Sequence, residues 1–488
     1  MKWLQRQPAS VGSDPRLCDF IQPALNHLMQ EGDGDILPIP FEFGRLSSES
    51  PTVLQLQMSS LSDYKWTPPR SFTVVRYPLK ARRITQFTPV DSILLEALIF
   101  ANGVRIESSR RPLKEKTVFS NRFQGGNGPL LYTETLWNGF AQRGMELASS
   151  NEFALKLDIA DFYNSIPHAY LKTCLLATGV SQNHLKCLMN ALNVSSHGAL
   201  VGIPVGPHFS HLLAELCLAD LDNTLTKEHI TFTRFNDDIH IFASTVAEID
   251  RANSVASRYM LGILGLSVNR AKQDLTTGAA YLDEATARHT PRSAEERSLS
   301  THREQNFPIY HSRPTNQDLS VGRRHFKTLD VAKVITPYLS SVSSDEDLAY
   351  VFRLLRSRGV PNGIGFVVDH LDRLFPVITE AISYIETVAQ TQAQVTKKQL
   401  RELFAFYESP VIIGSPFLQM MILRVIGKVA DLPNLNKFVE GMSYLTAGGR
   451  RELLTIACER QTLGGWVSVQ RNSKGWMETW EQSALDLF

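Results

Sequence analysis

The sequence predicts an α+β fold in which a mixed region of strands and helices precedes an all-helical C-terminal region. Apolar residues dominate 153–158, and apolar and polar residues alternate in 230–235 and 238–244. Because such alternation is typical of strands with one buried face, the last two segments predict a β-hairpin. In 331–488, apolar residues recur at i, i+3, i+4 and i+7 in one segment after another, which predicts a series of amphipathic helices.

Four regions follow from these patterns along the 488 residues. Residues 1–65 are expected to form an N-terminal extension, and 66–280 hold the strands of an antiparallel sheet with their flanking helices. Residues 281–330 are polar and irregular, as expected of a linker or a surface insertion. Residues 331–488 predict an α-solenoid of HEAT-like helical repeats or an irregular bundle.

Within the mixed region, SFTVVRYPL and RRITQFT read as strands, and VDSILLEALIFANG reads as a helix. Pro89 and Gly103 mark the expected start and end of that helix. Later segments predict further helices after 161, from 207 to about 225, and from Val246 to about Leu264. The helices and the strands alternate along the chain, so the helices are expected to flank the sheet.

Composition narrows the class of protein. Hydrophobic residues make up 43% of the chain and charged residues 20%, as in a globular protein. The sequence lacks a run of 18 uncharged apolar residues and an apolar signal-peptide core, so no membrane association is expected. The five cysteines show no C-x-x-C spacing, which argues against a disulfide framework and for a reduced, cytoplasmic setting.

The net charge of the chain is only +1, but one segment is strongly basic. Residues 70–123 contain eleven lysines and arginines against four acidic residues. A basic cluster of this kind can hold phosphates or a nucleic-acid backbone, and a solvated surface explains it equally well.

Three aspartates suggest a metal site. Asp158 ends the apolar segment 153–158, and the adjacent Asp237 and Asp238 lie at the predicted hairpin turn. A tandem pair alone also fits a turn held by Asx hydrogen bonds. Carboxylates at neighbouring strand ends, however, are what two Mg²⁺ ions need in nucleotidyl transfer, where the ions clamp the attacking and leaving oxygens.

Four short motifs occur in a fixed order along the mixed region. They are LDIADFYNSI, then GIPVGPHFS with the pattern P-x-G-x-x-x-S, then RFNDDI, then LGLSVNRAKQ. In this order they resemble motifs A, B, C and D of reverse transcriptases, and KARRIT and VFSNRF resemble the preceding finger motifs. The resemblance implies a fingers–palm architecture over residues 66–280, with the helical region in the place of a thumb.

The resemblance assigns the metal ligands. It implies that Asp158 and Asp237 ligate two Mg²⁺ ions, with Mn²⁺ as an alternative, and that the backbone carbonyl of Ile159 assists. Asp238 is the second carboxylate of the same box and would support the site. The resemblance thus implies a DNA polymerase that uses dNTPs as substrates.

The resemblance also assigns nucleotide contacts. Tyr163, five residues after Asp158, stands at the steric-gate position, where an aromatic ring excludes a ribose 2′-hydroxyl. An amphipathic core tyrosine is the alternative. Lys80, Arg82 and Arg83 would hold the triphosphate, since cationic side chains suit phosphate oxygens.

Three further positions follow from motifs B and D. Lys272 would protonate the leaving pyrophosphate, unless it is an ordinary solvated lysine. Gly206 would let the backbone approach the nucleotide closely. Val205 replaces the glutamine that many reverse transcriptases carry before this glycine, which puts ordinary template-guided selection in doubt. Phe235 and Asn236 also depart from the commoner tyrosine and aliphatic residues of the aspartate box, without removing a metal ligand.

Two other clusters have less specific meanings. His197, His208 and His211 gather around motif B, and the last two have helical spacing. Surface or phosphate-contacting histidines are the simpler interpretation, because a zinc site needs more ligands. Residues 120–122, Ser-Asn-Arg, fit either a substrate clamp or a strand end.

Val205 and the helical C-terminal region together resemble the abortive-infection (Abi) reverse transcriptases, including the AbiK-like and prophage-borne members. This resemblance implies template-independent synthesis primed by a protein hydroxyl, DNA attached covalently to the protein, a homo-oligomer, and antiphage defence in the bacterial cytoplasm. Two alternatives stay open. One is a templated enzyme of retron or group II intron type, although the retron N-A-x-x-H box is interrupted by Val194. The other is a non-enzymatic scaffold.

Overall fold

The computed structural model describes residues 16–34, 36–48, 64–76, 80–125, 130–132, 136–287, 291–301, 314, 316–339, 345–389, 395–442 and 444–472. The chain divides into two compact units. Unit 1 comprises Met1–Ile39, Leu46–Arg70 and Thr85–Thr290, and unit 2 comprises Pro40–Arg45, Ser71–Ile84 and Pro291–Phe488.

Unit 1 is built on an antiparallel sheet of four strands in the order β6-β7-β5-β8. The strands are β5 (Phe153–Asp158), β6 (Thr231–Phe235), β7 (Asp238–Ala243) and β8 (Asp274–Thr277). β6 and β7 form the predicted hairpin, and β5 pairs with β7 on one side and β8 on the other. The antiparallel sheet expected from the period-two segments is therefore confirmed.

Helices precede, separate and follow the strands of unit 1 along the chain. They are η2 (Leu17–Phe20), α1 (Ile21–Glu31), α4 (Pro89–Ser108), η4 (Leu113–Glu115), α5 (Leu136–Ser149), α6 (Phe162–Ser165), α7 (His168–Ala177), α8 (Gln182–Ser195), α9 (His208–Lys227), α10 (Val246–Tyr259), the π-helical turn η5 (Met260–Leu264) and α11 (Gly278–Ala287). A short ladder, β3 (Arg122–Phe123) with β4 (Leu131–Tyr132), completes the unit.

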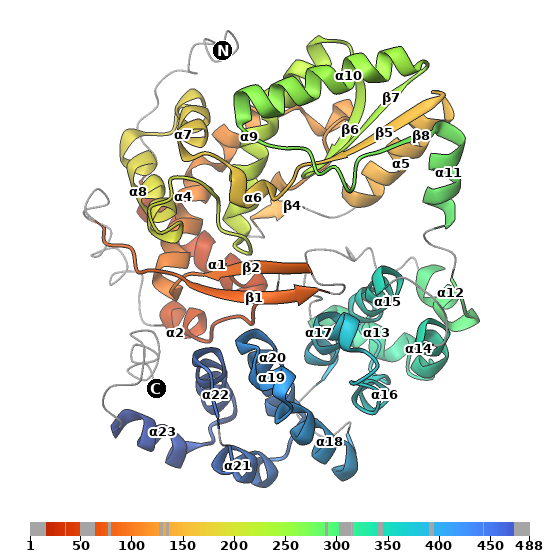
Figure 1. Ribbon diagram of the computed structural model, residues 1–488. Helices are drawn as coiled ribbons and strands as arrows, with labels where there is room; N and C mark the ends of the chain where they lie inside the picture. The colour runs from red at the N-terminus through yellow and green to blue at the C-terminus, as the bar shows by residue number, and fades with distance from the viewer. Residues whose placement is uncertain are drawn as a thin grey trace. The chain divides into compact units, whose positions relative to one another are not determined.

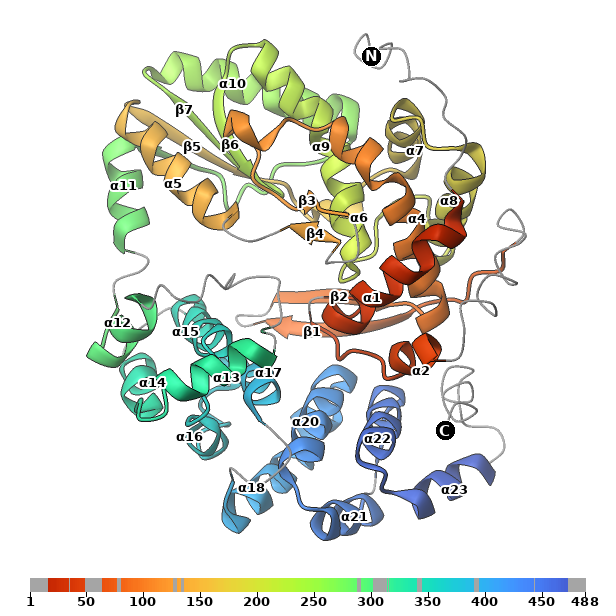
Figure 2. The same ribbon diagram turned by 180° about the vertical axis from the view of Figure 1, so that it is seen from behind.

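The two faces of the sheet pack on different helices. Leu157 and Ile239 belong to the large core that also contains Leu216 of α9 and Ile249 of α10. Figure 1 shows α10 lying across the strands on this face. On the opposite face, Phe242 packs with residues of α5 and α11, the two helices that are seen in front of the sheet and beside it in Figure 2. Strand alternation thus buries both faces of the sheet.

Helix α4 continues past its expected end. Thr88 caps the helix by accepting a hydrogen bond from the Asp91 N–H, and Pro89 occupies the first turn, as predicted. Gly103, however, does not end the helix, which runs to Ser108. A Cβ at position 103 would lie 2.3 Å from the Phe123 ring, so the glycine makes room for a neighbouring side chain instead of terminating the helix.

Unit 2 combines most of the hairpin formed by β1 (Arg70–Arg76) and β2 (Lys80–Gln86) with a series of helices. Helix α2 (Glu42–Ser48) begins in its short N-terminal segment. The remaining helices are α12 (Ala294–Thr301), α13 (Asn316–His325), α14 (Val331–Leu339), α15 (Asp345–Ser357), α16 (Ile364–Val368), η6 (Phe375–Val377), α17 (Ile378–Val388), α18 (Lys397–Tyr407), α19 (Pro410–Ile413), α20 (Pro416–Val429), α21 (Leu432–Glu440), α22 (Ala447–Arg460) and α23 (Gly464–Asn472).

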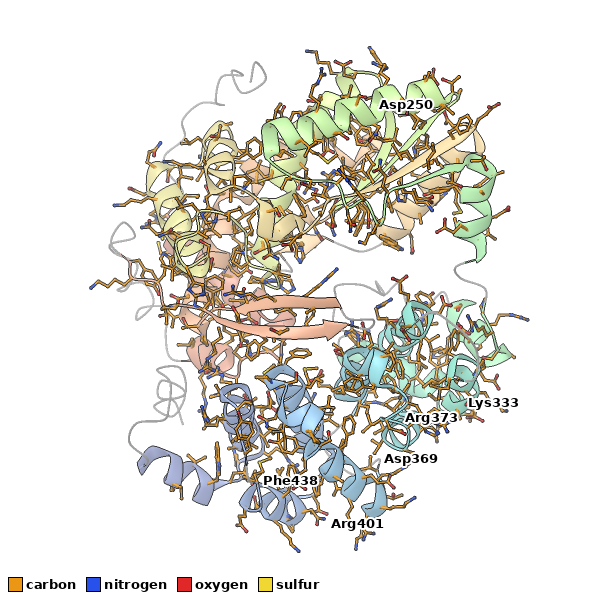
Figure 3. The ribbon with its side chains drawn as sticks, viewed as in Figure 1. Asp250, Lys333, Asp369, Arg373, Arg401 and Phe438 are labelled. Atoms are coloured by element: carbon orange, nitrogen blue, oxygen red, sulfur yellow. The ribbon has the colours of Figure 1, made fainter. Side chains whose placement is uncertain are left out.

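Unit 2 has its own core and polar surface. Phe404 and Phe438 stack with their ring centroids 4.2 Å apart, and Figure 3 labels Phe438 among the helices of this unit. Asp369 and Arg401, also labelled there, are exposed. Arg451 of α22 pairs with Glu42, which ties the short segment at residues 40–45 to the helical region. Among the described residues of 331–472 the expected series of helices is present; α21 has one buried face, whereas α20 is buried on nearly all sides.

The segment 281–330 is more regular than its composition suggests. Its described residues form the end of α11, then α12 and α13. Ser293 accepts a hydrogen bond from the Glu296 N–H at the start of α12, and Leu299 is fully buried. Short helices with few apolar residues give a weak periodic pattern, and for that reason the sequence favoured a linker here. Among all the described residues, no helix is both long enough and apolar enough to cross a membrane.

Candidate active site

The strand register brings two of the three predicted aspartates side by side. Asp158, the last residue of β5, lies directly opposite Asp238, the first residue of β7. Asp237 immediately precedes Asp238 in the turn that connects β6 to β7. Residues directly opposite in an antiparallel pair have Cβ atoms about 5 Å apart, so two like charges face each other at the strand ends. This repulsion favours a bound cation.

The turn before Asp237 requires an unusual backbone. Asn236 has φ 52, in the left-handed region that asparagine adopts more easily than most residues. Its N–H donates to the Ser120 Oγ at 2.8 Å, and its side-chain oxygen accepts from the Asn121 amide at 2.8 Å. The Ser-Asn-Arg segment at 120–122 therefore acts as a support for the aspartate turn, and Arg122 begins β3.

A fully buried arginine supports the same turn from the inside. Arg234 of β6 is 0% exposed. It makes paired hydrogen bonds to Asp222, at 2.8 and 2.6 Å, and to Glu215, both at 3.0 Å. The Arg234 Nη1 also donates to the carbonyl oxygen of Asn236 at 2.8 Å. One side chain thus connects helix α9 to the backbone beside Asp237, through charge-assisted bonds that hold their geometry well.

The ion network extends to the segment that carries Ser120. Arg110 donates to Glu215 at 2.7 Å, to Glu107 at 2.8 Å and to the Ser120 carbonyl at 2.8 Å. Burial raises the pKa of Glu215, but the charges of Arg234 and Arg110 outweigh it, and the net shift is downward. Glu215 is therefore ionised, and its charge is balanced inside the protein.

Sequence reasoning missed this network, although two signals for it were present. Strand alternation places Arg234 on the same face as Phe232, which is buried. Glu215 and Asp222 are seven residues apart, which puts them on one face of α9. A cation and two acids on faces that are otherwise apolar predict a buried ion pair, because an unpaired charge there would be too costly.

Lys272 binds the first aspartate directly. Its Nζ lies 2.5 Å from the Asp158 Oδ1, and the Asn269 amide donates to the Oδ2 of the same carboxylate at 2.9 Å. Burial lowers the pKa of Lys272, but the hydrogen bond to Asp158 and the charges of Asp158, Asp238 and Asp237 outweigh it, so the pKa is raised. The lysine therefore stays positively charged, and it neutralises part of the carboxylate cluster.

The donor set fits a divalent cation. Asp158, Asp237 and Asp238 supply carboxylate oxygens, which are the ligands Mg²⁺ prefers. The ammonium of Lys272 on Asp158 shows that a cation is accepted at this position. Ile159 follows Asp158 and forms an antiparallel β-bridge with Val268. The backbone of Ile159 is therefore held beside the same strand end. These four residues could hold metal ions next to a triphosphate.

Comparison with known proteins identifies the architecture around these carboxylates. The family model described as reverse transcriptase (RNA-dependent DNA polymerase) matches residues 109–310. The chain carries a reverse-transcriptase domain. Such a domain is a nucleotidyltransferase of the DNA-polymerase type. The matched residues include Asp158, Asp237, Asp238, Asn269 and Lys272, and the support formed by residues 120–122.

Two further comparisons show more distant similarity. The chain is 30% identical over 135 residues to the retron Mx65 reverse transcriptase of Myxococcus xanthus. The aligned segment covers 24% of this chain and 31% of that protein. The chain thus spans about a third of the length of this relative. A structure of apo telomerase from Candida tropicalis aligns with 83% of this chain and 69% of its own, at 10% identity and a TM-score of 0.36. A TM-score this low supports no statement about function.

In the reverse-transcriptase domain, Tyr163 lies within motif A. Its hydroxyl is 2.7 Å from the Nδ1 of His211 on α9, and its carbonyl oxygen accepts from the Ile203 N–H at 2.7 Å. Tyr163 is half-buried and packs against the main core of unit 1. Its role as a gate stays a prediction.

The motif B turn is held closely by the N-terminal segment. Gly206 has φ 116, which only glycine adopts without strain. A Cβ at Gly34 would lie 2.5 Å from the Gly206 carbonyl oxygen, and Gly34 forms a bridge with Pro207. The Val205 carbonyl accepts from the Thr85 N–H at 2.8 Å. The N-terminal extension, for which the sequence indicated no role, therefore supports motif B.

The three basic residues predicted to hold the triphosphate lie on β2, at residues that cluster with unit 2. Arg82 and Arg83 are exposed. Arg83 donates to the Ser71 Oγ across the hairpin at 2.9 Å. The side chain of Lys80 lies outside the described residues. The assignment of these residues to the triphosphate stays a prediction.

The three histidines near motif B do not form one site. His211 contacts Tyr163, and His197 is exposed in the loop before motif B. His208 is buried with its Nδ1 3.1 Å from the Nε2 of His27. The Leu130 N–H donates to the His27 Nδ1 at 3.1 Å. His27, Glu96 and His208 lie close enough to share a metal ion, but both ring nitrogens of His27 are already engaged, which favours a hydrogen-bonded core.

Glu96 adds a titratable group to this core. It is 1% exposed and accepts from the Phe209 N–H in the first turn of α9. Burial raises the pKa of Glu96 to about 8, while His208 and the Phe209 hydrogen bond act in the opposite direction. Burial and the neighbouring His208 hold the pKa of His27 well below its ordinary value. Both groups therefore prefer their neutral forms in the folded protein.

Glu96→Gln is expected to raise stability at alkaline pH. A folded-state pKa above the unfolded value of 4.5 means that the folded protein binds the proton more tightly. Stability from Glu96 is therefore complete below pH 4.5 and is lost as the pH rises to about 8. The variant should gain roughly 3–5 kcal/mol over the wild type at pH 8.5, and no more than about 1 kcal/mol at pH 5.

Urea denaturation at both pH values measures this difference. The contribution of His27 to stability is lost as the pH falls below the ordinary pKa of histidine. This loss occurs in both proteins, so the difference between their stabilities isolates the contribution of Glu96. An equal stability difference at pH 5 and pH 8.5 would show that Glu96 does not titrate in this range.

Proposed function

We propose that this protein is a DNA polymerase that joins dNTPs by two-metal nucleotidyl transfer in its reverse-transcriptase domain. The observation that carries the proposal is the strand register that sets Asp158 opposite Asp238, with Asp237 in the adjoining turn. The site has three carboxylates at one end of the sheet and a lysine cation among them, and the family match covers the same residues. This combination is expected of a nucleotidyltransferase and of few other proteins.

Each residue of the site has a proposed role. Asp158 and Asp237, with the Ile159 carbonyl, would ligate Mg²⁺ or Mn²⁺, and Asp238 would support them. The metal ions would activate the primer hydroxyl and stabilise charge on the leaving oxygens. Lys272, which pairs with Asp158, would carry a positive charge beside the departing pyrophosphate and would protonate it.

The nucleotide would lie between motifs A and B. Tyr163 would exclude the ribose 2′-hydroxyl, so that deoxynucleotides are preferred. Gly206 would allow the backbone to approach the nucleotide, while Arg82, Arg83 and Lys80 would meet its phosphates.

We further propose that synthesis is template-independent and primed by a hydroxyl of the protein, leaving the DNA product attached covalently to the protein. Val205 supports this proposal, because valine cannot donate a hydrogen bond to a nucleotide or a template. The helical region 331–488 supports it as well, since an enzyme without a long duplex needs no duplex-gripping thumb. In this proposal the protein assembles as a homo-oligomer and acts in antiphage defence. The helices of unit 2 would form a repeat domain.

A templated enzyme is the second candidate. The retron reverse transcriptase that the chain resembles over 135 residues favours it. This candidate predicts that a primer and a template both enter the same carboxylate site. The two proposals therefore differ in the use of a template and in the source of the primer hydroxyl, and not in the chemistry.

Incubation of the purified full-length protein with labelled dNTPs and Mg²⁺ tests both candidates. Template-free, protein-primed synthesis is expected to produce a labelled ladder that migrates with the protein and survives denaturation. Nuclease digestion followed by mass spectrometry of the protein should then locate a nucleotide on one residue with a side-chain hydroxyl.

The two candidates give opposite results when nucleic acid is added. If synthesis stays unchanged when an annealed DNA primer and RNA template are supplied, the template-free proposal stands. Synthesis that begins only after their addition, with no label on the protein, supports the templated alternative. No incorporation under either condition, with correctly folded protein and either Mg²⁺ or Mn²⁺, would contradict the polymerase proposal itself.

A further inference from the structure

The side chain of Tyr163 ends on a histidine. Its hydroxyl lies 2.7 Å from the His211 Nδ1, and the two rings meet edge to face with their centroids 5.8 Å apart. Tyr163 belongs to the short helix α6 within motif A, whereas His211 belongs to the first turn of α9, the helix that begins at the end of motif B. The contact therefore joins the two motifs across 48 residues of sequence.

The backbone at Tyr163 is also held by the segment that leads into motif B. The Ile203 N–H donates to the Tyr163 carbonyl at 2.7 Å, and the Gly202 N–H donates to the Ile166 carbonyl at 2.8 Å. Gly202 has φ 92, and a Cβ there would lie 3.1 Å from the Asn164 carbonyl oxygen, so only glycine allows this close approach. With the main chain of Tyr163 held in this way, the remaining freedom of the residue is rotation of its side chain.

We propose that His211 is a specificity-determining positioning residue that holds the ring of Tyr163 against the sugar of the incoming nucleotide. This inference rests on the proposed function, in which Tyr163 separates deoxyribose from ribose. The ring of Tyr163 excludes a ribose 2′-hydroxyl only if the ring cannot rotate away from the sugar. The hydrogen bond from the hydroxyl end to His211 restricts that rotation, and the edge-to-face contact adds to it.

Substitution of His211 by leucine is expected to weaken sugar discrimination. His211→Leu removes the hydrogen bond and keeps a side chain of similar bulk, so the ratio of kcat/KM for dATP to kcat/KM for ATP should fall roughly three- to tenfold. The change should appear as a lower KM for ATP, with kcat for dATP almost unchanged. Both values of kcat/KM are measured on one preparation of each protein. A lower fraction of folded enzyme therefore affects both values equally and cancels in their ratio.

Two further variants separate the hydrogen bond from the bulk of the ring. His211→Asn places an amide near the position of the Nδ1 and should keep most of the discrimination. Tyr163→Phe removes only the hydroxyl and should reproduce the effect of His211→Leu. Because both act on one hydrogen bond, the double variant should be no worse than either single variant.

A matched control comes from a second half-buried tyrosine. The Tyr170 hydroxyl, on α7, lies 3.3 Å from the Tyr259 hydroxyl of α10. Tyr170→Phe should leave the discrimination unchanged. The inference is overturned if His211→Leu keeps the wild-type ratio, or if its effect adds fully to that of Tyr163→Phe.

Failure of the inference can be told from failure of the proposed function. A wild type that incorporates dATP while His211→Leu shows no altered ratio contradicts the inference alone. If the wild type incorporates neither nucleotide, the proposed function fails, and calorimetric binding of dATP and ATP to both proteins then decides the inference. Equal preference for dATP in wild type and His211→Leu would overturn it.

Discussion

Replacement of Asp237 by asparagine is expected to lower the rate of dNTP incorporation by at least about 10³-fold. The side chain keeps its shape and loses the negative charge that would hold a divalent cation. In nucleotidyl transfer, metal ions stabilise the charge that develops in the transition state by several kcal/mol. Each 1.4 kcal/mol of activation free energy corresponds to about a tenfold change in rate. The measurement is kcat for labelled dNTP incorporation with saturating Mg²⁺.

The control is Asp250→Asn on α10. Asp250 is also an aspartate of the reverse-transcriptase domain, and it is exposed on α10, as Figure 3 shows. This variant should retain the wild-type rate. Isothermal titration of both variants with Mn²⁺ provides a second readout, since only Asp237→Asn should weaken metal binding. Full activity of Asp237→Asn would contradict the two-metal proposal, whatever the source of the primer.

Replacement of Arg234 by methionine is expected to lower the free energy of unfolding by roughly 3–5 kcal/mol, because it leaves buried carboxylates without their counter-charge. Arg234 is 0% exposed, and it is hydrogen-bonded to both Glu215 and Asp222. Arg234→Lys restores the charge but cannot form two paired hydrogen bonds, so an intermediate loss is expected. Urea denaturation followed by circular dichroism measures both.

An exposed arginine provides the comparison. Arg251 pairs with Glu228, and their side chains are 54% and 42% exposed, so Arg251→Met should change stability by less than about 1 kcal/mol. If Arg234→Met proves insoluble, Arg234→Lys still tests the argument. A stability equal to that of the wild type in Arg234→Lys would show that the paired geometry has no energetic weight.

Much of the local structure could be predicted from the sequence. The alternation in 230–244 predicted β6, β7 and the turn between them, because strand periodicity and turn residues are local properties. The predicted start of α4 was also correct, since Thr88 and Pro89 act within one turn. Its predicted end was wrong at Gly103, because the reason for that glycine is the ring of Phe123, twenty residues further along the chain.

The partners of the site residues could not be predicted in the same way. The three aspartates were recognisable by type and order, but the sequence did not show that Lys272 binds Asp158 across 114 residues. Nor did it show that Ser120 supports Asn236 across 116 residues. Charged and polar residues have many potential partners in a chain of this length, and only folding selects among them.

The order of the amino acids specifies which chemical groups are present, where they stand along the chain, and most of the strands and helices that carry them. The tertiary structure alone decided that Asp158 stands opposite Asp238, that Arg234 is buried between two acids, and that Tyr163 ends on His211. The physical reason is that the periodicity of helices and strands depends on neighbours within a few residues, whereas these contacts depend on how distant elements pack and on the cost of burying an unpaired charge.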